Sequence, residues 1–97
     1  MEMPNLYYTL TPTTAFRTQL AALQKAKLIM QQMKLTSVNI HGTKNVTGST
    51  SDTYVVVTFI QIDSTRFEAI AMASGTSAQK LVGDFQTRLK NVERIDY

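Results

Sequence analysis

The chain has no cysteine and a single histidine, His41, among its 97 residues. The absence of cysteine excludes disulfide bonds, thiolate metal ligands and a cysteine nucleophile. One histidine does not supply the several imidazoles of a His-based zinc site within one chain. We therefore expect no metal and no cofactor, and a fold that depends on its hydrophobic core.

Long apolar runs are absent as well. No run approaches the roughly 20 apolar residues that cross a bilayer, so no membrane segment is expected. The stretch from Met1 to Pro4 lacks the basic and then apolar pattern of a signal peptide, which favours the cytoplasm. The abundance of Thr, Ser and Gln and the charged content of 18% are also found in exported proteins. An exported protein whose signal has been removed is therefore the alternative.

Charge of one sign is not concentrated anywhere in the chain. The net charge is +3, and the lysines and arginines are spread along the whole sequence. Nucleic-acid-binding proteins usually gather these residues on one face, so the pattern favours a solubilising surface. The length fits one domain, residues 1–97, and the 43% hydrophobic content is ordinary for a globular protein.

Hydrophobic periodicity predicts the order β-α-β-β-β-α. The predicted elements are a strand over 5–10, a helix from Pro12 or Thr13 to Lys34, a strand over 36–44, a polar loop over 45–52, strands over 53–62 and 66–73, and a helix that starts after 74–77. Consecutive strands with short links favour an antiparallel sheet. The predicted fold class is α+β, a two-layer sandwich with an antiparallel sheet of three to four strands and two helices on one face. Whether the first strand joins the sheet is left open.

The two helices are predicted from their apolar stripes. In the first, the stripe is Phe16, Leu20, Leu23, Ala26, Met30 and Met33, with Leu28 off the stripe and exposed. Its start is indicated by the hydroxyl and proline residues of 11–14. In the second helix, the apolar face is Ala78, Leu81, Val82, Phe85, Leu89 and Val92.

The sequence gives little reason to expect an enzyme. No Walker loop, dinucleotide fingerprint or nucleophile elbow is present. His41 lies on a predicted strand beside Gly42, and the carboxylates are scattered without a recognisable acid–base pair. We predict a non-catalytic protein with no catalytic residues.

The strand over 53–62 is apolar on both faces. If the helices cover Val55, Val57 and Phe59, the other face points away from them. The residues of that face are Tyr54, Val56, Ile60 and Ile62. A contiguous exposed apolar surface often marks a partner interface, and the simplest partner is a second copy. We therefore predict a homodimer formed through this face. The alternative is that the first strand, the loop over 45–52 or the C-terminal tail covers it.

The junction before the last helix is a candidate anion site. Backbone N–H groups, the hydroxyls and the nearby lysine are suited to a phosphate or carboxylate. The residues are Ser74, Gly75, Thr76, Ser77 and Lys80. The alternative interpretation is that they only turn the chain and cap the helix, since Thr76 and Gln79 have capping-box spacing.

In order of elements, residues 13–92 resemble a double-stranded-RNA-binding domain, whose helices cover one face of a three-stranded sheet. In that family, paired lysines that open the last helix bind phosphates across the RNA groove. This chain has Gln79 and Lys80 at that place. It lacks the family's Gly-Pro and histidine loop, and the strand over 5–10 is additional. The resemblance implies duplex-RNA binding as an alternative function.

Overall fold

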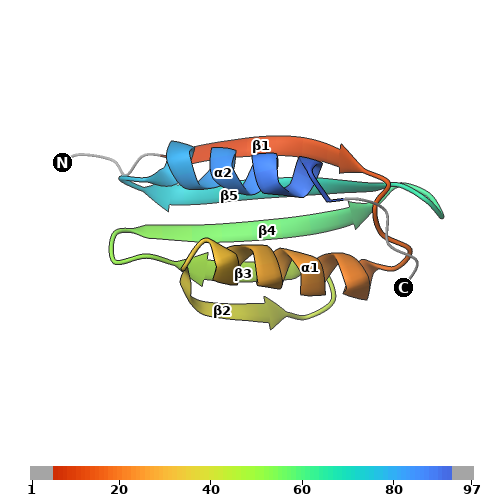
Figure 1. The fold of residues 1–97 in the computed structure, drawn as a ribbon, viewed down its shortest axis with the longest axis horizontal. Helices are drawn as coiled ribbons and strands as arrows, with labels where there is room; N and C mark the ends of the chain where they lie inside the picture. Colours follow the sequence, from red (N-terminus) through yellow and green to blue (C-terminus); the bar gives the residue numbers. More distant parts are fainter. Residues whose placement is uncertain (1–5, 93–97) are drawn as a thin grey trace.

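The computed structural model describes residues 6–92, which form a five-stranded antiparallel sheet and two helices (Figure 1). The strands are β1 (Leu6–Thr13), β2 (Thr36–His41), β3 (Asn45–Ser49), β4 (Thr53–Gln61) and β5 (Phe67–Gly75); the helices are α1 (Gln19–Gln32) and α2 (Ala78–Lys90). In space the strands follow the order β1-β5-β4-β3-β2. The predicted α+β class with an antiparallel sheet is therefore confirmed, with one strand more than expected.

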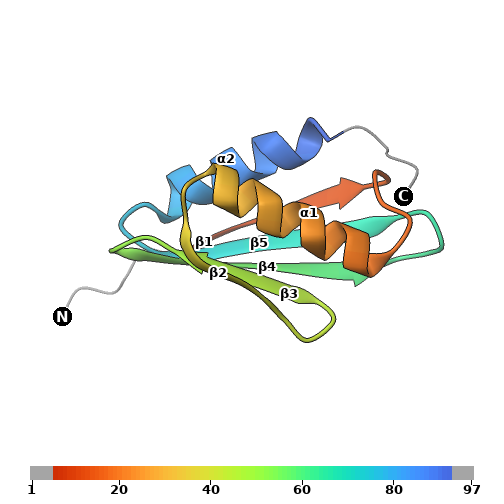
Figure 2. The same ribbon diagram turned by 60° about the horizontal axis from the view of Figure 1, so that its bottom comes forward.

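Both helices lie on the same side of the sheet, as Figure 2 shows. Helix α2 packs on β1 and β5, whereas α1 packs on β2, β3 and β4. Helix α1 is the crossover between the two edges of the sheet, because β1 forms one edge and β2 the other. Within residues 6–92, the opposite face of the sheet carries no helix (Figure 2).

The core lies between the helices and the sheet. Along β4 and β5 burial alternates with a period of two, because successive side chains of a strand point to opposite faces. Four phenylalanines are completely buried there, namely Phe16, Phe59, Phe67 and Phe85. The rings of Phe16 and Phe59 meet edge to face, with centroids 6.1 Å apart, an arrangement that aromatic pairs favour. Helix α2 contributes the face that its sequence predicts, with Ala78, Val82, Phe85 and Leu89 buried.

The predicted start of the first helix is wrong. Strand β1 continues to Thr13, which pairs with Phe67, and α1 begins only at Gln19. The helix is capped by Thr18, whose Oγ1 accepts a hydrogen bond from the Ala21 N–H at 3.1 Å. Since Phe16 now lies in the preceding loop and fills the core, Leu20 is not needed there and is 59% exposed. Leu28 is exposed, as expected.

The prediction of a polar loop over 45–52 is also wrong. Residues Asn45–Ser49 form β3, which pairs with β2 on one side and β4 on the other. Val46 lies opposite both Ile40 and Val57 and is fully buried beneath the helix layer. Gly48 lies on the same face, where an added Cβ would meet Met30 and Leu35 at 3.2 to 3.3 Å. A small residue therefore lets α1 approach the sheet closely.

Candidate functional site

The face of the sheet opposite the helices, called the open face here, is divided into two halves. Residues directly opposite one another in a β ladder share a face, so the pairing register assigns the side chains. On β1, β5 and β4 the open face consists of Leu6, Tyr8, Leu10, Pro12, Glu68, Ile70, Met72, Ser74, Tyr54, Val56, Thr58 and Ile60. On β3 and β2 it includes Asn45, Thr47, Ser49, Thr36, Asn39 and His41. The first half is mostly apolar and the second is polar.

The apolar half is strongly exposed in the single chain. Leu6 is 75% exposed, Tyr8 64% and Leu10 54% on β1. Tyr54 is 52% and Ile60 44% exposed on β4. Val56, Ile70 and Met72 lie between these residues and are half-buried by their neighbours on the same face. Most single chains expose no contiguous apolar patch beyond a few hundred Å² without a functional reason.

Sequence reasoning found the β4 part of this surface and missed the rest. Tyr54, Val56 and Ile60 lie together on the open face, as their alternation with Val55, Val57 and Phe59 predicts. Ile62 lies just beyond the end of β4, is 55% exposed, and its N–H donates to the Arg66 carbonyl. The contributions of β1 and β5 were missed, although both strands alternate. The first strand was one of the segments considered as a cover for this surface. It joins the sheet instead and enlarges the surface.

The polar half is internally hydrogen-bonded. The His41 Nε2 and Thr47 Oγ1 atoms are 2.8 Å apart, and the Thr58 hydroxyl donates to Asn45 Oδ1 at 2.7 Å. These pairs link β2 with β3 and β3 with β4. His41 is thus a cross-strand residue at the end of β2, where the sequence placed it.

The open face carries almost no charge. Of the described strand residues that point to this side, Glu68 is the only one with a charged side chain, and none is Lys or Arg. The described cations lie on the helices, in the loops and in the turns, for example Lys25, Lys80 and Arg88. The sheet side and the helix side of the molecule therefore differ sharply in character.

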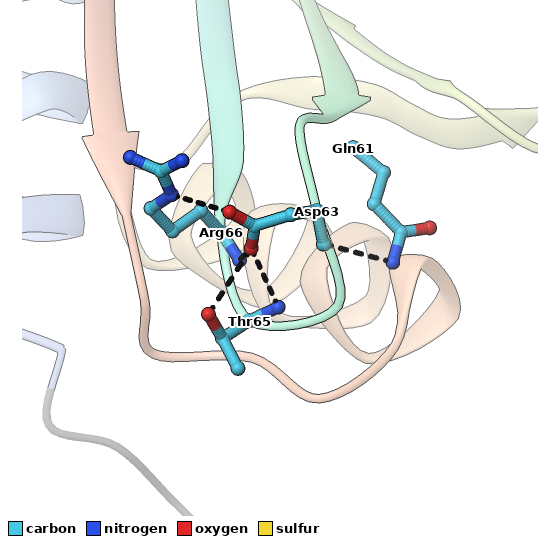
Figure 3. A network of polar contacts seen from close by, with 4 residues as sticks. All are labelled: Gln61, Asp63, Thr65 and Arg66. Atoms are coloured by element: carbon cyan, nitrogen blue, oxygen red, sulfur yellow. Dashed lines mark hydrogen bonds and ion pairs between the residues drawn. The ribbon is translucent and has the colours of Figure 1, made fainter.

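One end of the open face is fixed by the β4–β5 turn (Figure 3). The carboxylate of Asp63 accepts hydrogen bonds from the Thr65 and Arg66 N–H groups, both at 2.9 Å, and pairs with the Arg66 guanidinium at 2.7 Å. The Gln61 side chain donates to the Asp63 carbonyl at 3.1 Å. Donation by the Thr65 N–H and the Arg66 side chain lowers the pKa of Asp63 to about 2. This closed turn holds Ile62 at the rim of the apolar half.

The depressed pKa of Asp63 predicts a pH-dependent loss of stability. Its folded-state pKa is about 2, whereas an unfolded aspartate titrates near about 3.9. The carboxylate therefore stabilises the fold at neutral pH, and this contribution is lost as the pH falls from about 4 to about 2. In thermal melts, Asp63→Asn should melt below the parent chain at pH 7, and most of this difference in melting temperature should be lost at pH 2. A gap that is independent of pH would contradict this assignment.

Two groups of the candidate anion site, the Thr76 hydroxyl and the Ser77 N–H, already have partners within the chain. The Thr76 hydroxyl donates to the Asp52 carboxylate at 2.6 Å, and the Ser77 N–H donates to Thr53 Oγ1 at 2.9 Å. Hydrogen bonds from Thr76, Thr50 and Thr53 lower the pKa of Asp52. Ser77 is the N-cap of α2 but makes no side-chain cap bond, so the capping-box geometry is not formed. The protein's own carboxylate thus takes the hydroxyl bond that an anion would need.

Lys80 and Gly75 complete that junction. Lys80 is exposed in the first turn of α2, and Gly75 has a φ of +139° where β5 ends. Anion binding by residues 74–77 and Lys80 stays a prediction, and the contacts of Asp52 give it no support.

The described part of the chain offers neither a metal site nor a membrane-spanning helix. Within residues 6–92 no group of three or more His, Cys, Asp or Glu side chains is arranged to hold a metal ion. Neither α1 nor α2 is long and apolar enough to cross a membrane. Comparison with known proteins finds no matching family model, no similar curated protein and no similar solved structure.

Proposed function

We propose that this protein is a non-catalytic assembly module that forms a homodimer through the open face of its sheet. The observation that carries the proposal is the apolar half of that face, to which β1, β5 and β4 contribute exposed side chains such as Tyr8, Tyr54 and Ile60. Burying such a surface contributes roughly 25 cal/mol for each Å² of apolar area removed from water. A second copy supplies an equally apolar surface.

The dimensions of the sheet suit a modest dimer interface. Three strands of eight or nine residues cover about 14 by 28 Å at the usual strand spacing, or about 400 Å² in projection. A typical stable interface takes about 800 Å² from each partner and combines an apolar centre with a polar rim. The polar half on β2 and β3 would extend the contact toward that size. Two sheets stacked in this way pack about 10 Å apart.

The charge distribution supports a second copy over nucleic acid as the partner. Phosphate backbones are bound chiefly by Lys and Arg, and the described open face has neither. Its one charged group, Glu68, would repel a phosphate. The duplex-RNA alternative would have to use the helix side, where Lys80 is an exposed cation beside Gln79. No described contact favours that alternative.

Sedimentation or light scattering over a concentration series tests the proposal. We expect the mass to rise from monomer to dimer between low and high micromolar concentration, because the apolar half is buried on association. The variant Ile60→Lys should lose this face-to-face association over the same range, since it places a charge in the apolar half. Val56→Lys should behave in the same way.

Leu28→Lys is a matched control for Ile60→Lys. Leu28 lies on α1, on the other side of the molecule, and is 44% exposed, as Ile60 is. The control should dimerise like the parent chain. A parent chain that is monomeric at high micromolar concentration overturns the proposal. Unfolding of Ile60→Lys, with Leu28→Lys folded, would instead show that this face is covered within one chain.

A further inference from the structure

Within residues 6–92, strand β1 forms an edge of the sheet, and one side of its backbone has no partner strand. In the described residues it pairs only with β5. Its eight residues, LYYTLTPT, include no charged side chain. Its register with β5 runs without a shift from Leu6 to Thr13. Natural edge strands are usually protected by charges, bulges or a covering segment, and an edge without them is a site for pairing with another strand.

The opposite edge, formed by β2, differs from β1 in its register. Strand β2 has a register shift against β3 between Thr36 and Asn39, and Ser37 adopts a positive φ of 53° in the irregular part. The Asn39 side chain donates to the Ser37 carbonyl and so occupies a backbone acceptor there. A bulge of this kind interrupts a ladder and hinders the addition of a further strand. Of the two sheet edges in the described part of the chain, only β1 is regular.

The direction of the β1 backbone groups follows from the pairing register of the strands. The Ile62 N–H donates to the Arg66 carbonyl. Hydrogen-bonded pairs alternate along an antiparallel ladder, so the even-numbered residues of β4 form backbone hydrogen bonds with the even-numbered residues of β5. The odd-numbered residues of β5 therefore face β1, and they lie opposite Tyr7, Thr9, Thr11 and Thr13. The even-numbered residues of β1 must point their backbone groups to the free edge.

Those outward groups are the N–H and C=O of Leu6, Tyr8 and Leu10, together with the C=O of Pro12. Pro12 has no N–H to leave unpaired, which is the position at which an edge strand tolerates proline. The same even-numbered residues place their side chains on the open face, with Leu6, Tyr8 and Leu10 all more than half exposed. The free edge and the apolar half thus adjoin one another along β1.

We propose that a second copy of the chain pairs with this edge, β1 antiparallel to β1, so that the two five-stranded sheets become one. With Tyr8 opposite Tyr8 on the two-fold axis, Leu6 of each copy lies opposite Leu10 of the other. Every outward N–H of Leu6, Tyr8 and Leu10 then meets an outward carbonyl, as an antiparallel ladder requires. The absence of charge along 6–13 means that no like charges oppose one another.

This edge contact goes beyond the face-to-face dimer and does not depend on it. Pairing through β1 brings the apolar halves of two copies side by side on one continuous sheet, because Leu6, Tyr8 and Leu10 lie next to the junction. A doubled apolar surface is then available to a second such pair. Edge and face contacts together give a closed tetramer with two-fold axes, whereas either contact alone gives a dimer.

Amide hydrogen exchange, measured residue by residue on the parent chain at dilute and at high micromolar concentration, tests the edge contact. The N–H groups of Leu6, Tyr8 and Leu10 should exchange freely when dilute and at least about tenfold more slowly when concentrated. The N–H groups of Tyr7, Thr9 and Thr11 are internal controls, since they bond to β5 and should be protected at both concentrations. Equal and fast exchange at Leu6, Tyr8 and Leu10 in the associated protein overturns the edge contact.

Proline substitution at Tyr8 gives an independent test. Tyr8→Pro removes an outward N–H from each copy and leaves the β5 ladder intact, so edge association should weaken at least about tenfold. Tyr8→Thr loses the same side chain but keeps the N–H, and it should weaken association less. If Tyr8→Pro does not fold, Leu10→Pro and Leu10→Thr replace the pair, two residues before the natural Pro12. Equal weakening by the proline and threonine variants overturns the edge contact.

Comparison with Ile60→Lys separates this inference from the proposed function. Ile60 lies on β4, which β5 separates from β1, so a lysine there does not touch the edge. If Ile60→Lys abolishes association and Tyr8→Pro leaves it unchanged, the edge contact alone is overturned. The reverse result overturns the face-to-face dimer alone. A monomer at every concentration overturns both.

Discussion

Gly75→Ala should destabilise the protein by about 3 kcal/mol or more and leave much of it unfolded at moderate temperature. Gly75 ends β5 with a φ of +139°, a conformation that residues with a Cβ rarely adopt. An added Cβ would overlap the carbonyl oxygen of Asp52 and lie 2.6 Å from Thr53 Cα. Both obstacles are backbone, which cannot move without opening the β4–β5 ladder. Urea denaturation followed by circular dichroism measures the effect.

Gly83→Ala is the matched control for this prediction, because it makes the same chemical change in a helix. Gly83 lies in α2, and an added Cβ would meet nothing within 4 Å. Alanine is better than glycine in a helix interior by about 1 kcal/mol, so this variant should be more stable than the parent chain. If both variants had the same stability, the tight junction at Gly75 would be refuted.

Val46→Asp should abolish folding. Val46 is fully buried in β3, between Ile40 of β2 and Val57 of β4. A carboxylate there would lose its hydration without gaining a partner, at a cost of several kcal/mol, which is comparable to the whole stability of a small domain. One-dimensional proton NMR would show collapsed amide dispersion.

Thr43→Asp makes the corresponding change in the exposed turn between β2 and β3 and should leave the fold intact. Comparison of the two variants tests whether residues 45–49 form a strand or the polar loop that the local sequence suggests. A folded Val46→Asp variant would show that residues 45–49 do not belong to the sheet.

Much of the fold is predictable because it depends on local periodicity. The alternation along 53–62 and 66–73 predicts a hairpin with one face toward the helices, and β4 and β5 form it. The apolar spacing after residue 77 predicts α2 and its buried face. The same alternation placed Tyr54, Val56 and Ile60 on the open face. In each case apolar residues recur at a spacing that places them on one face of the strand or helix, whichever surface that face packs against.

The predictions were wrong for segments whose secondary structure or burial depends on residues distant in the sequence. Val46 and Gly48 are surrounded by polar residues of turn-forming type, and only the ladders to β2 and β4 make this stretch a strand. Thr11 and Pro12 are typical of a helix start, yet their pairing with Ala69 and Glu68 holds them in β1. Leu20 fits the helical stripe, but Phe16 takes the place in the core beside Phe59. Strand pairing overrode local preference in β3 and β1, and core packing did so at Leu20.

By itself the sequence determined the α+β class, the α2 face, the β4–β5 hairpin and the apolar character of both faces of β4. Only the tertiary structure decided that β1 is an edge strand and that its Leu6, Tyr8 and Leu10 continue the apolar half of the open face. The physical reason is the range of the interactions. Side-chain alternation is set by neighbours in the chain, whereas strand order is set by pairing between segments far apart in the sequence, such as Leu6 with Ser74.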